Sequence, residues 1–159
     1  MSRVFIGIGS NEGERFQHIS RAAQQLQATD GIRVVQMAMI IETDPVGGPP
    51  QGPYLNTVVE LATTLEPLAL LERLQAIERQ RGRVPSSQRW GPRPMDLDLL
   101  LYDDRVMDHP RLVLPHPRLP ERAFVLEPLA QLAPELIHPV LRQSIAALLA
   151  QLLNRSMVQ

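Results

Sequence analysis

The sequence predicts an α+β sandwich in which helices cover a mainly antiparallel sheet. Strand-like and helix-like segments alternate, in the order strand, helix, two strands, helix, strand and further helix. Hydrophobic residues make up 44% of the 159 residues, which is enough to bury a core. Fifteen prolines and nine glycines gather in a few stretches that are typical of loops between such elements.

The first half of the chain is expected to contain strands and one helix. Residues 4–8 are apolar and lead into a Gly-Ser-Asn turn, as a buried strand would. Apolar residues between positions 16 and 26 recur at helical spacing. Residues 32–43 are strand-like, and residues 54–65 alternate between apolar and polar side chains, so both stretches are predicted to be strands.

The second half begins with a helix, because Pro67 suits a first helical position and an apolar stripe follows it. Residues 95–102 form the next strand, and residues 121–131 and 144–153 are predicted helices. This order is the split β-α-β-β-α-β pattern of a ferredoxin-like α/β/α sandwich with a mainly antiparallel central sheet. We expect residues 1–159 to form a single domain.

Composition excludes several classes of protein. No apolar run approaches the roughly 20 residues that span a bilayer. The absence of cysteine excludes disulfide scaffolds, thiolate zinc sites and cysteine nucleophiles. All sixteen basic residues are arginine, so a P-loop lysine and a Schiff-base lysine are excluded. The net charge of −1 gives no overall basic surface for nucleic acid. We therefore expect a soluble, cytoplasmic protein.

Three stretches rich in proline or glycine are predicted to be long loops, namely residues 44–53, 82–94 and 109–120. Loops near a dozen residues are uncommon in compact domains and often carry function. For any one of them, a plain surface connector is an equally good interpretation.

Two aspartates dominate the strand predicted over residues 95–102. Side chains alternate along a strand, so Met95, Leu97, Leu99 and Leu101 are predicted to point into the core, while Asp96 and Asp98 lie side by side on the other face. Two adjacent carboxylates repel, and a hard cation such as Mg²⁺ would relieve the repulsion. A solvated outer face, or pairing with nearby arginines, would also account for the pair.

Arginines cluster immediately before the aspartate pair. Five of the sixteen fall between positions 79 and 93, a stretch that contains no acidic residue. Guanidinium groups bind phosphate oxygens in a bidentate manner. Arginines beside two carboxylates therefore favour phosphoryl-type transfer, in which charge neutralisation and positioning do most of the work. A solvated, arginine-rich loop is the alternative.

Other polar and aromatic residues near the loops are candidates for substrate contacts. Gln75 and Glu78 share one helix face and would meet a nucleotide or a loop backbone, although a plain exposed face is the simpler interpretation. Trp90 is either a packing anchor or a flat surface for a planar heterocycle. Tyr54 and Asn56 share a strand face, where the Asn56 amide either suits the edge of a pterin or a base or simply caps the strand.

The third loop carries a separate basic group, made of Arg111, His116, Arg118 and Arg122. His116 lies between two prolines and is either a phosphate donor or a surface histidine. The glycines at the end of the first strand fail the dinucleotide-binding spacing, because Glu12 stands where the third glycine belongs.

Residues 89–100, Arg-Trp-Gly-Pro-Arg-Pro-Met-Asp-Leu-Asp-Leu-Leu, resemble the signature of the 6-hydroxymethyl-7,8-dihydropterin pyrophosphokinase family, which acts in folate biosynthesis. The resemblance runs from residue 4 to residue 139, and further matching pieces occur in the family's order. They include Ile8-Gly9-Ser10-Asn11, Tyr54-Leu55-Asn56, Gln75-x-x-Glu78, Pro115-His116-Pro117-Arg118 and Arg122-Ala123-Phe124. The resemblance implies the ferredoxin-like sandwich, long active-site loops, and transfer of pyrophosphate from ATP to the pterin hydroxymethyl group, giving AMP.

The resemblance also implies roles for individual residues. Two Mg²⁺ ions bound with ATP would be held by Asp96 and Asp98. The moving pyrophosphoryl group would be neutralised by Arg83, Arg93 and Arg122. ATP would be contacted by Gln75, Glu78, Arg93, Arg111, His116 and Arg122. The pterin pocket would be lined by Thr43, Val46, Tyr54 and Asn56, with Trp90 and Phe124 sandwiching the ring.

This chain has Pro85 and Val113 at two positions where some members of the family carry a basic residue and a hydroxyl residue, respectively. An RNA-binding module and a small-molecule regulatory domain of the same fold are the alternative functions. An aromatic content of 4% argues against the first, and the aspartate pair beside five arginines argues against the second. We expect a monomer with no nucleic-acid or membrane partner, in which the first two loops close over the substrates.

Overall fold

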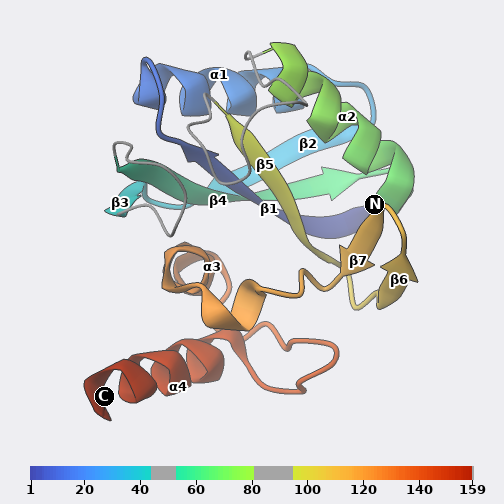
Figure 1. The fold of residues 1–159 in the computed structure, drawn as a ribbon. Coiled ribbons are helices and arrows are strands. Elements are labelled where there is room, and N and C mark those ends of the chain that lie inside the picture. Colours follow the sequence, from blue (N-terminus) through green and yellow to red (C-terminus); the bar gives the residue numbers. More distant parts are fainter. Residues whose placement is uncertain (44–52, 81–94, 159) are drawn as a thin grey trace.

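The computed structural model describes residues 1–43, 53–80 and 95–158, drawn as the coloured ribbon of Figure 1. The remaining segments, 44–52 and 81–94, contain almost all of the first two predicted loops, whose expected closure therefore lies outside the described residues. The predicted site residues that lie there are Val46, Arg83, Trp90 and Arg93, together with Pro85.

A five-stranded antiparallel sheet forms the centre of the fold, and its order is β2-β4-β1-β5, with β3 also paired to β4. The strands are β1 (Ser2–Ser10), β2 (Ile32–Met37), β3 (Ile41–Thr43), β4 (Tyr54–Thr63) and β5 (Asp96–Tyr102). The predicted ferredoxin-like arrangement is confirmed, because both halves of the split β-α-β pattern interleave in one sheet.

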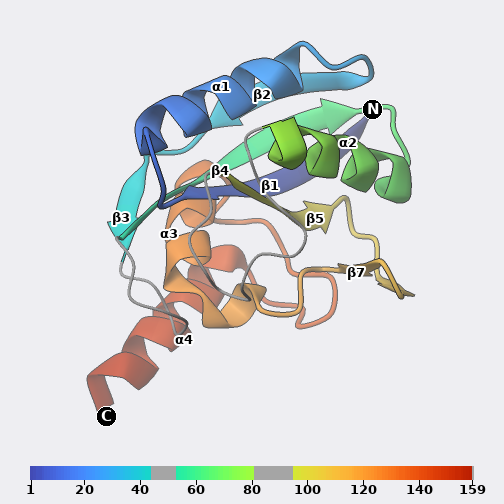
Figure 2. The ribbon, with the colours of Figure 1, turned by 45° about the horizontal axis from the view of Figure 1, so that its top comes forward.

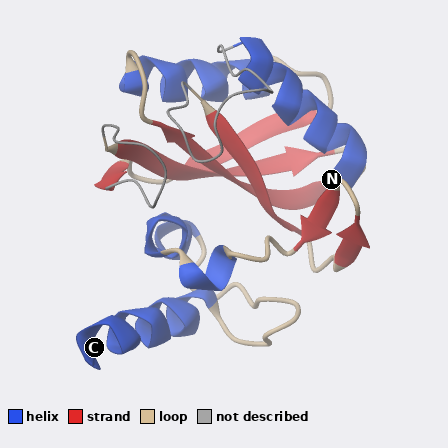
Figure 3. Cartoon of the chain, viewed as in Figure 1, coloured by secondary structure: helices blue, strands red, loops and turns tan. Residues whose placement is uncertain are grey.

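Helices cover both faces of this sheet (Figures 1 and 2). One face packs against α1 (Arg15–Gln27) and α2 (Pro67–Gln80), whose buried residues Ile19, Leu26, Leu70 and Leu74 lie at helical spacing. The other face packs against α3 (Ala123–Leu132), and α4 (Ile145–Val158) packs against α3 on the side away from the sheet. Figure 3 shows the resulting sequence of layers, with helix above and below the strands.

The alternation predicted for β5 holds at its start and fails at its end. Met95, Leu97 and Leu99 enter the core on the α1/α2 side, as predicted, but Leu101 packs on the α3/α4 side. The pairing with β1 shifts between Phe5 and Ile6, which face Leu101 and Leu99 respectively. This irregularity puts one extra residue into β5 and reverses the side chains beyond it, so the prediction for Leu101 was wrong.

Two other predicted segments differ in detail. The single strand expected over residues 32–43 divides into β2 and β3, because the Met39 N–H leaves the sheet and donates to Gln131 Oε1 of α3 at 2.6 Å. The third predicted loop contains regular structure. A hairpin of β6 (Met107–His109) and β7 (Leu112–Leu114) precedes a 3-10 turn at Leu119–Glu121, and alternating burial of two leucines in β7 supports the short strand.

Candidate active site

A row of three residues crosses the end of the sheet. Gly9 of β1 pairs with Asn56 of β4 on one side and with Asp96 of β5 on the other. Directly paired residues project to the same face of a sheet, so the Asn56 amide and the Asp96 carboxyl flank a position that has no side chain. Neighbouring strands lie about 4.8 Å apart, so the Cα atoms of Asn56 and Asp96 are roughly 10 Å apart.

This row lies on the face that α3 covers, because Phe5 and Val58, on the same side of β1 and β4, pack in the α3/α4 core. Gly7 repeats the pattern one step inward, since it pairs with both Val58 and Asp98. Gly7 and Gly9 therefore form a glycine floor, a surface without β1 side chains between β4 and β5, at the end of the sheet where β1 finishes. The side chains of Asn56 and Tyr54 reach over Gly9, and that of Leu100 reaches over Gly7.

The Asn56 side of the floor is rigid. Asn56 is buried, and its Nδ2 donates to Thr43 Oγ1 at 2.7 Å. Thr43 in turn pairs with Tyr54, which lies two residues before Asn56 on the same face. Three of the six side chains predicted for the pterin pocket are thus brought together. The amide oxygen of Asn56 is directed at Gly9, because a Cβ built there would lie 2.9 Å from Asn56 Oδ1.

The Asp96 side of the floor carries negative charge. Asp96 and Asp98 are both partly exposed and share the face that the alternation predicted. Within residues 1–43, 53–80 and 95–158, no three His, Cys, Asp or Glu side chains form a group suited to hold a metal unaided. Two partly exposed carboxylates on one face fit Mg²⁺, which takes one or two protein carboxylates and fills its remaining positions with water and phosphate oxygens.

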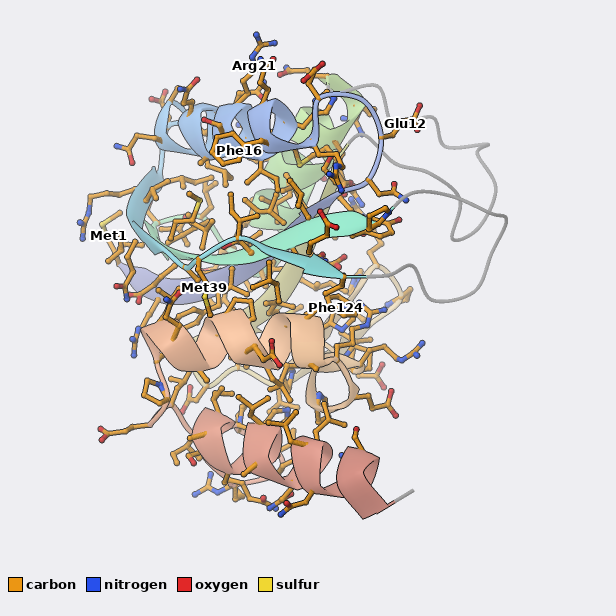
Figure 4. All side chains as sticks on the ribbon, turned by 90° about the vertical axis from the view of Figure 1, so that its left-hand side faces the viewer. Met1, Glu12, Phe16, Arg21, Met39 and Phe124 are labelled. Atoms are coloured by element: carbon orange, nitrogen blue, oxygen red, sulfur yellow. The ribbon has the colours of Figure 1, made fainter. Side chains whose placement is uncertain are left out.

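A cation already faces this pair. Arg122, the residue before α3, has its Nη1 3.8 Å from Asp98 Oδ2, and the two side chains are 27% and 34% exposed. The Arg122 guanidinium also lies over the ring of Phe124, 5.5 Å from its centroid, which restricts both side chains. Figure 4 shows Phe124 at the start of α3, between that helix and the sheet.

His116 lies in the same electrostatic environment. Burial and the nearby Arg122 and Arg118 lower the pKa of His116 to about 4, although Asp96 acts in the opposite direction. Its backbone N–H donates to Leu100 O at 2.9 Å, and its Nδ1 accepts the Arg118 N–H at 3.1 Å. A neutral ring that accepts at Nδ1 carries its proton on Nε2, so His116 is a neutral donor suited to a phosphate oxygen.

The other predicted nucleotide contacts have different surroundings. Arg111 is exposed, and its Nη1 lies 3.4 Å from Glu72 Oε1 on α2. Gln75 of α2 is partly buried. Glu78, three residues further along, is buried, and its Oε2 accepts the Leu97 N–H at 2.8 Å.

Sequence reasoning missed the glycine floor. The sequence assigns Gly9 to a turn and to a family motif and excludes a dinucleotide motif, yet the spacing of two places Gly7 and Gly9 on one strand face. That spacing was the available signal. The register that sets Gly9 between Asn56 and Asp96 depends on tertiary pairing and has no local signal.

Comparisons with known proteins agree with the resemblance. The family model for 7,8-dihydro-6-hydroxymethylpterin-pyrophosphokinase (HPPK) matches residues 5–134. A 2-amino-4-hydroxy-6-hydroxymethyldihydropteridine pyrophosphokinase of Pseudomonas aeruginosa is 43% identical over 139 residues, which is 87% of this chain and 85% of the relative. A protein of the same name from Bacillus subtilis is 43% identical over 129 residues, covering 81% and 77%.

A longer relative and a solved structure contain the same unit as part of a larger chain. The "Folic acid synthesis protein fol1" of Schizosaccharomyces pombe is 38% identical over 149 residues, which is 94% of this chain but 20% of the relative. A Plasmodium falciparum HPPK-DHPS crystal structure with pteroate aligns with a TM-score of 0.80 at 15% identity, over 99% of this chain and 43% of that one. This likeness supports the fold. No helix in the described part of the chain is long and apolar enough to cross a membrane.

Proposed function

The chain belongs to the HPPK family, and from this membership we propose which of its residues bind ATP and metal and which bind the pterin. The reaction is the transfer of pyrophosphate from ATP to the hydroxymethyl group of 6-hydroxymethyl-7,8-dihydropterin in folate biosynthesis. A bond forms between the hydroxymethyl oxygen and the β-phosphorus, the bond from that phosphorus to the α-phosphate oxygen breaks, and AMP leaves.

The single observation that carries the proposal is the glycine floor between Asn56 and Asp96. It places no side chain of β1 between a buried amide and a pair of carboxylates, whose strands put them roughly 10 Å apart. A pterin ring against Asn56 would therefore direct its hydroxymethyl group toward a triphosphate held at Asp96 and Asp98. Holding two reactants in attack geometry is itself a large part of such a rate enhancement.

On the phosphate side, Asp96 and Asp98 would hold Mg²⁺, and we propose two ions bound with ATP. The metal, when bound, neutralises charge on the triphosphate oxygens. Arg122 would exchange its contact with Asp98 for the moving pyrophosphoryl group, and His116 would donate its Nε2–H to a phosphate oxygen. Arg111 would reach ATP by breaking its salt bridge with Glu72. Both side chains are exposed, so breaking this salt bridge costs little free energy. Arg83, Arg93 and Gln75 complete the proposed set, whereas the carboxyl of Glu78 accepts the Leu97 N–H.

On the pterin side, the Asn56 amide would pair with the edge of the ring, while Thr43 fixes the orientation of that amide. Tyr54 lies beside them, and Phe124 offers a ring face held in place by Arg122. Val46 and Trp90 complete this proposed pocket. We also propose a single-domain monomer in the cytoplasm, without nucleic-acid or membrane partners, consistent with the net charge of −1.

Counting bound metal tests this proposal. Electron paramagnetic resonance with Mn²⁺ in place of Mg²⁺, in the presence of α,β-methylene-ATP, should give two ions per chain. Asp96→Asn and Asp98→Asn should lower that number, whereas Asp108→Asn, an exposed aspartate on β6, should not. Two ions in both site variants would remove Asp96 and Asp98 from the proposed metal site.

A further inference from the structure

Glu78 makes a contact that differs from the role implied by the resemblance. The side chain belongs to the last turn of α2 and is only 5% exposed. Its Oε2 accepts the backbone N–H of Leu97 at 2.8 Å. Leu97 is the residue between Asp96 and Asp98, so the buried carboxyl of α2 is bonded to the centre of the metal-binding segment.

The position of this bond in the sheet matters. Among the described residues the strand order ends at β5, so β5 is paired there with one neighbouring strand, β1. There Gly9 pairs with Asp96 and Gly7 with Asp98. Glu78 supplies a partner for the Leu97 N–H along the other side, and the Leu97 side chain is itself buried against the α1/α2 core. Leu97 is therefore fixed by its side chain and its backbone together.

Fixing Leu97 constrains both aspartates, because each is joined to it through one planar peptide unit. Burying a carboxyl group is costly unless it is well hydrogen-bonded, so an apolar residue would be the cheaper way to fill this place in α2. A carboxylate, however, accepts a backbone N–H more strongly than a neutral group does. The residue type thus suits the holding of a backbone in place.

We propose that Glu78 is a positioning residue, which sets the spacing of Asp96 and Asp98 for metal binding by holding the backbone of Leu97. The inference rests on the proposed function of the two aspartates. Glu78 would then act through β5 without touching ATP, and Gln75 on the same helix face would be the one available to the nucleotide.

A matched pair of variants separates this role from a direct one. Glu78→Gln and Glu78→Met have nearly the same length and no charge, but only glutamine retains an oxygen that accepts the Leu97 N–H. The control is Glu60→Met, which removes another buried carboxyl, one that is bonded to Arg3 and Gln36 further along the sheet. All three are expected to lower the melting temperature.

The measurements are Mn²⁺ affinity with α,β-methylene-ATP, by electron paramagnetic resonance, and hydrogen exchange of the Leu97 amide, by NMR. We expect Glu78→Met to weaken Mn²⁺ binding roughly tenfold or more, as loss of a group that orients metal ligands does elsewhere. Leu97 exchange should accelerate in that variant. Glu78→Gln should stay within about threefold of the unaltered chain, and Glu60→Met should not change Mn²⁺ affinity.

Different outcomes overturn different claims. If Glu78→Met accelerates Leu97 exchange but leaves Mn²⁺ affinity unchanged, the bond is only structural and the inference is wrong. If Glu78→Gln weakens Mn²⁺ binding roughly tenfold or more, Glu78 acts by its charge and the inference is wrong. The Glu78→Gln variant gives this answer even if Glu78→Met does not fold. If the unaltered chain binds Mn²⁺ independently of Asp96 and Asp98, the proposed function fails instead.

Discussion

Gly9→Ala should damage pterin binding through Asn56. The added Cβ would lie 2.9 Å from Asn56 Oδ1, about half an ångström inside ordinary contact. Asn56 has little freedom to yield, because it is 8% exposed and its Nδ2 is bonded to Thr43 Oγ1 at 2.7 Å. Either the amide moves and weakens that bond, or the strands separate locally.

The expected size follows from the bond at risk. One neutral hydrogen bond contributes about 1 kcal/mol, which is roughly a fivefold change in affinity. We therefore expect the KM for the pterin to rise about fivefold to tenfold. The KM for ATP should change much less, because the clash is with the Asn56 side of the floor.

Gly7→Ala is the matched control, because Gly7 lies on the same strand and the same face. A Cβ there would meet Leu100 Cδ1 at 3.6 Å, an ordinary contact. Steady-state assays of AMP release, with pterin and ATP varied in turn, compare the two variants, and thermal melting checks their folding. Equal pterin KM values for Gly9→Ala and Gly7→Ala would show that the position of the Asn56 amide does not matter.

The other predictions concern the charged side of the site. Asp96→Ala and Asp98→Ala should each retain less than about a tenth of the rate of AMP release while remaining folded, and a larger residual rate in either would contradict the metal role. Arg122→Ala should lower kcat on the order of 10²-fold with a much smaller rise in the KM for ATP, because its charge meets a group whose charge grows in the transition state; a rise in KM alone would restrict Arg122 to ground-state binding. His116 has a pKa lowered from 6.5 to about 4, so the folded chain binds fewer protons than the unfolded chain between these values, and His116 should lower the free energy of unfolding as the pH falls from 6.5 to about 4. His116→Gln should flatten that part of the melting-temperature profile, and an unchanged slope would show that the pKa is not shifted.

The sequence predicted those parts of the site that depend on local periodicity. Asp96 and Asp98 are two residues apart on a strand, and this spacing alone places both on one face. The shared face of Tyr54 and Asn56 follows from the same rule. The helices and the antiparallel strands could likewise be predicted from the sequence, because the spacing of apolar residues in them differs from that in the loops.

Features that depend on pairing between distant segments of the chain could not be predicted from the sequence. Leu101 was assigned to the wrong face because the irregularity in β5 is set by its pairing with β1. The contact of Glu78 joins positions 19 residues apart, whereas the sequence indicated a helix face shared with Gln75 and, by resemblance, a contact with ATP. The position of Gly9 in the site depends on the strand register, which only the assembled sheet determines.

Transfer of label from ATP to the pterin tests the central claim most directly. The purified chain would be incubated with Mg²⁺, 6-hydroxymethyl-7,8-dihydropterin and ATP labelled with ³²P at the β-phosphate. We predict that the label appears in the pterin product, with one AMP released for each pterin consumed. Label retained in ADP, or AMP release that does not depend on the pterin, would contradict pyrophosphate transfer by this chain.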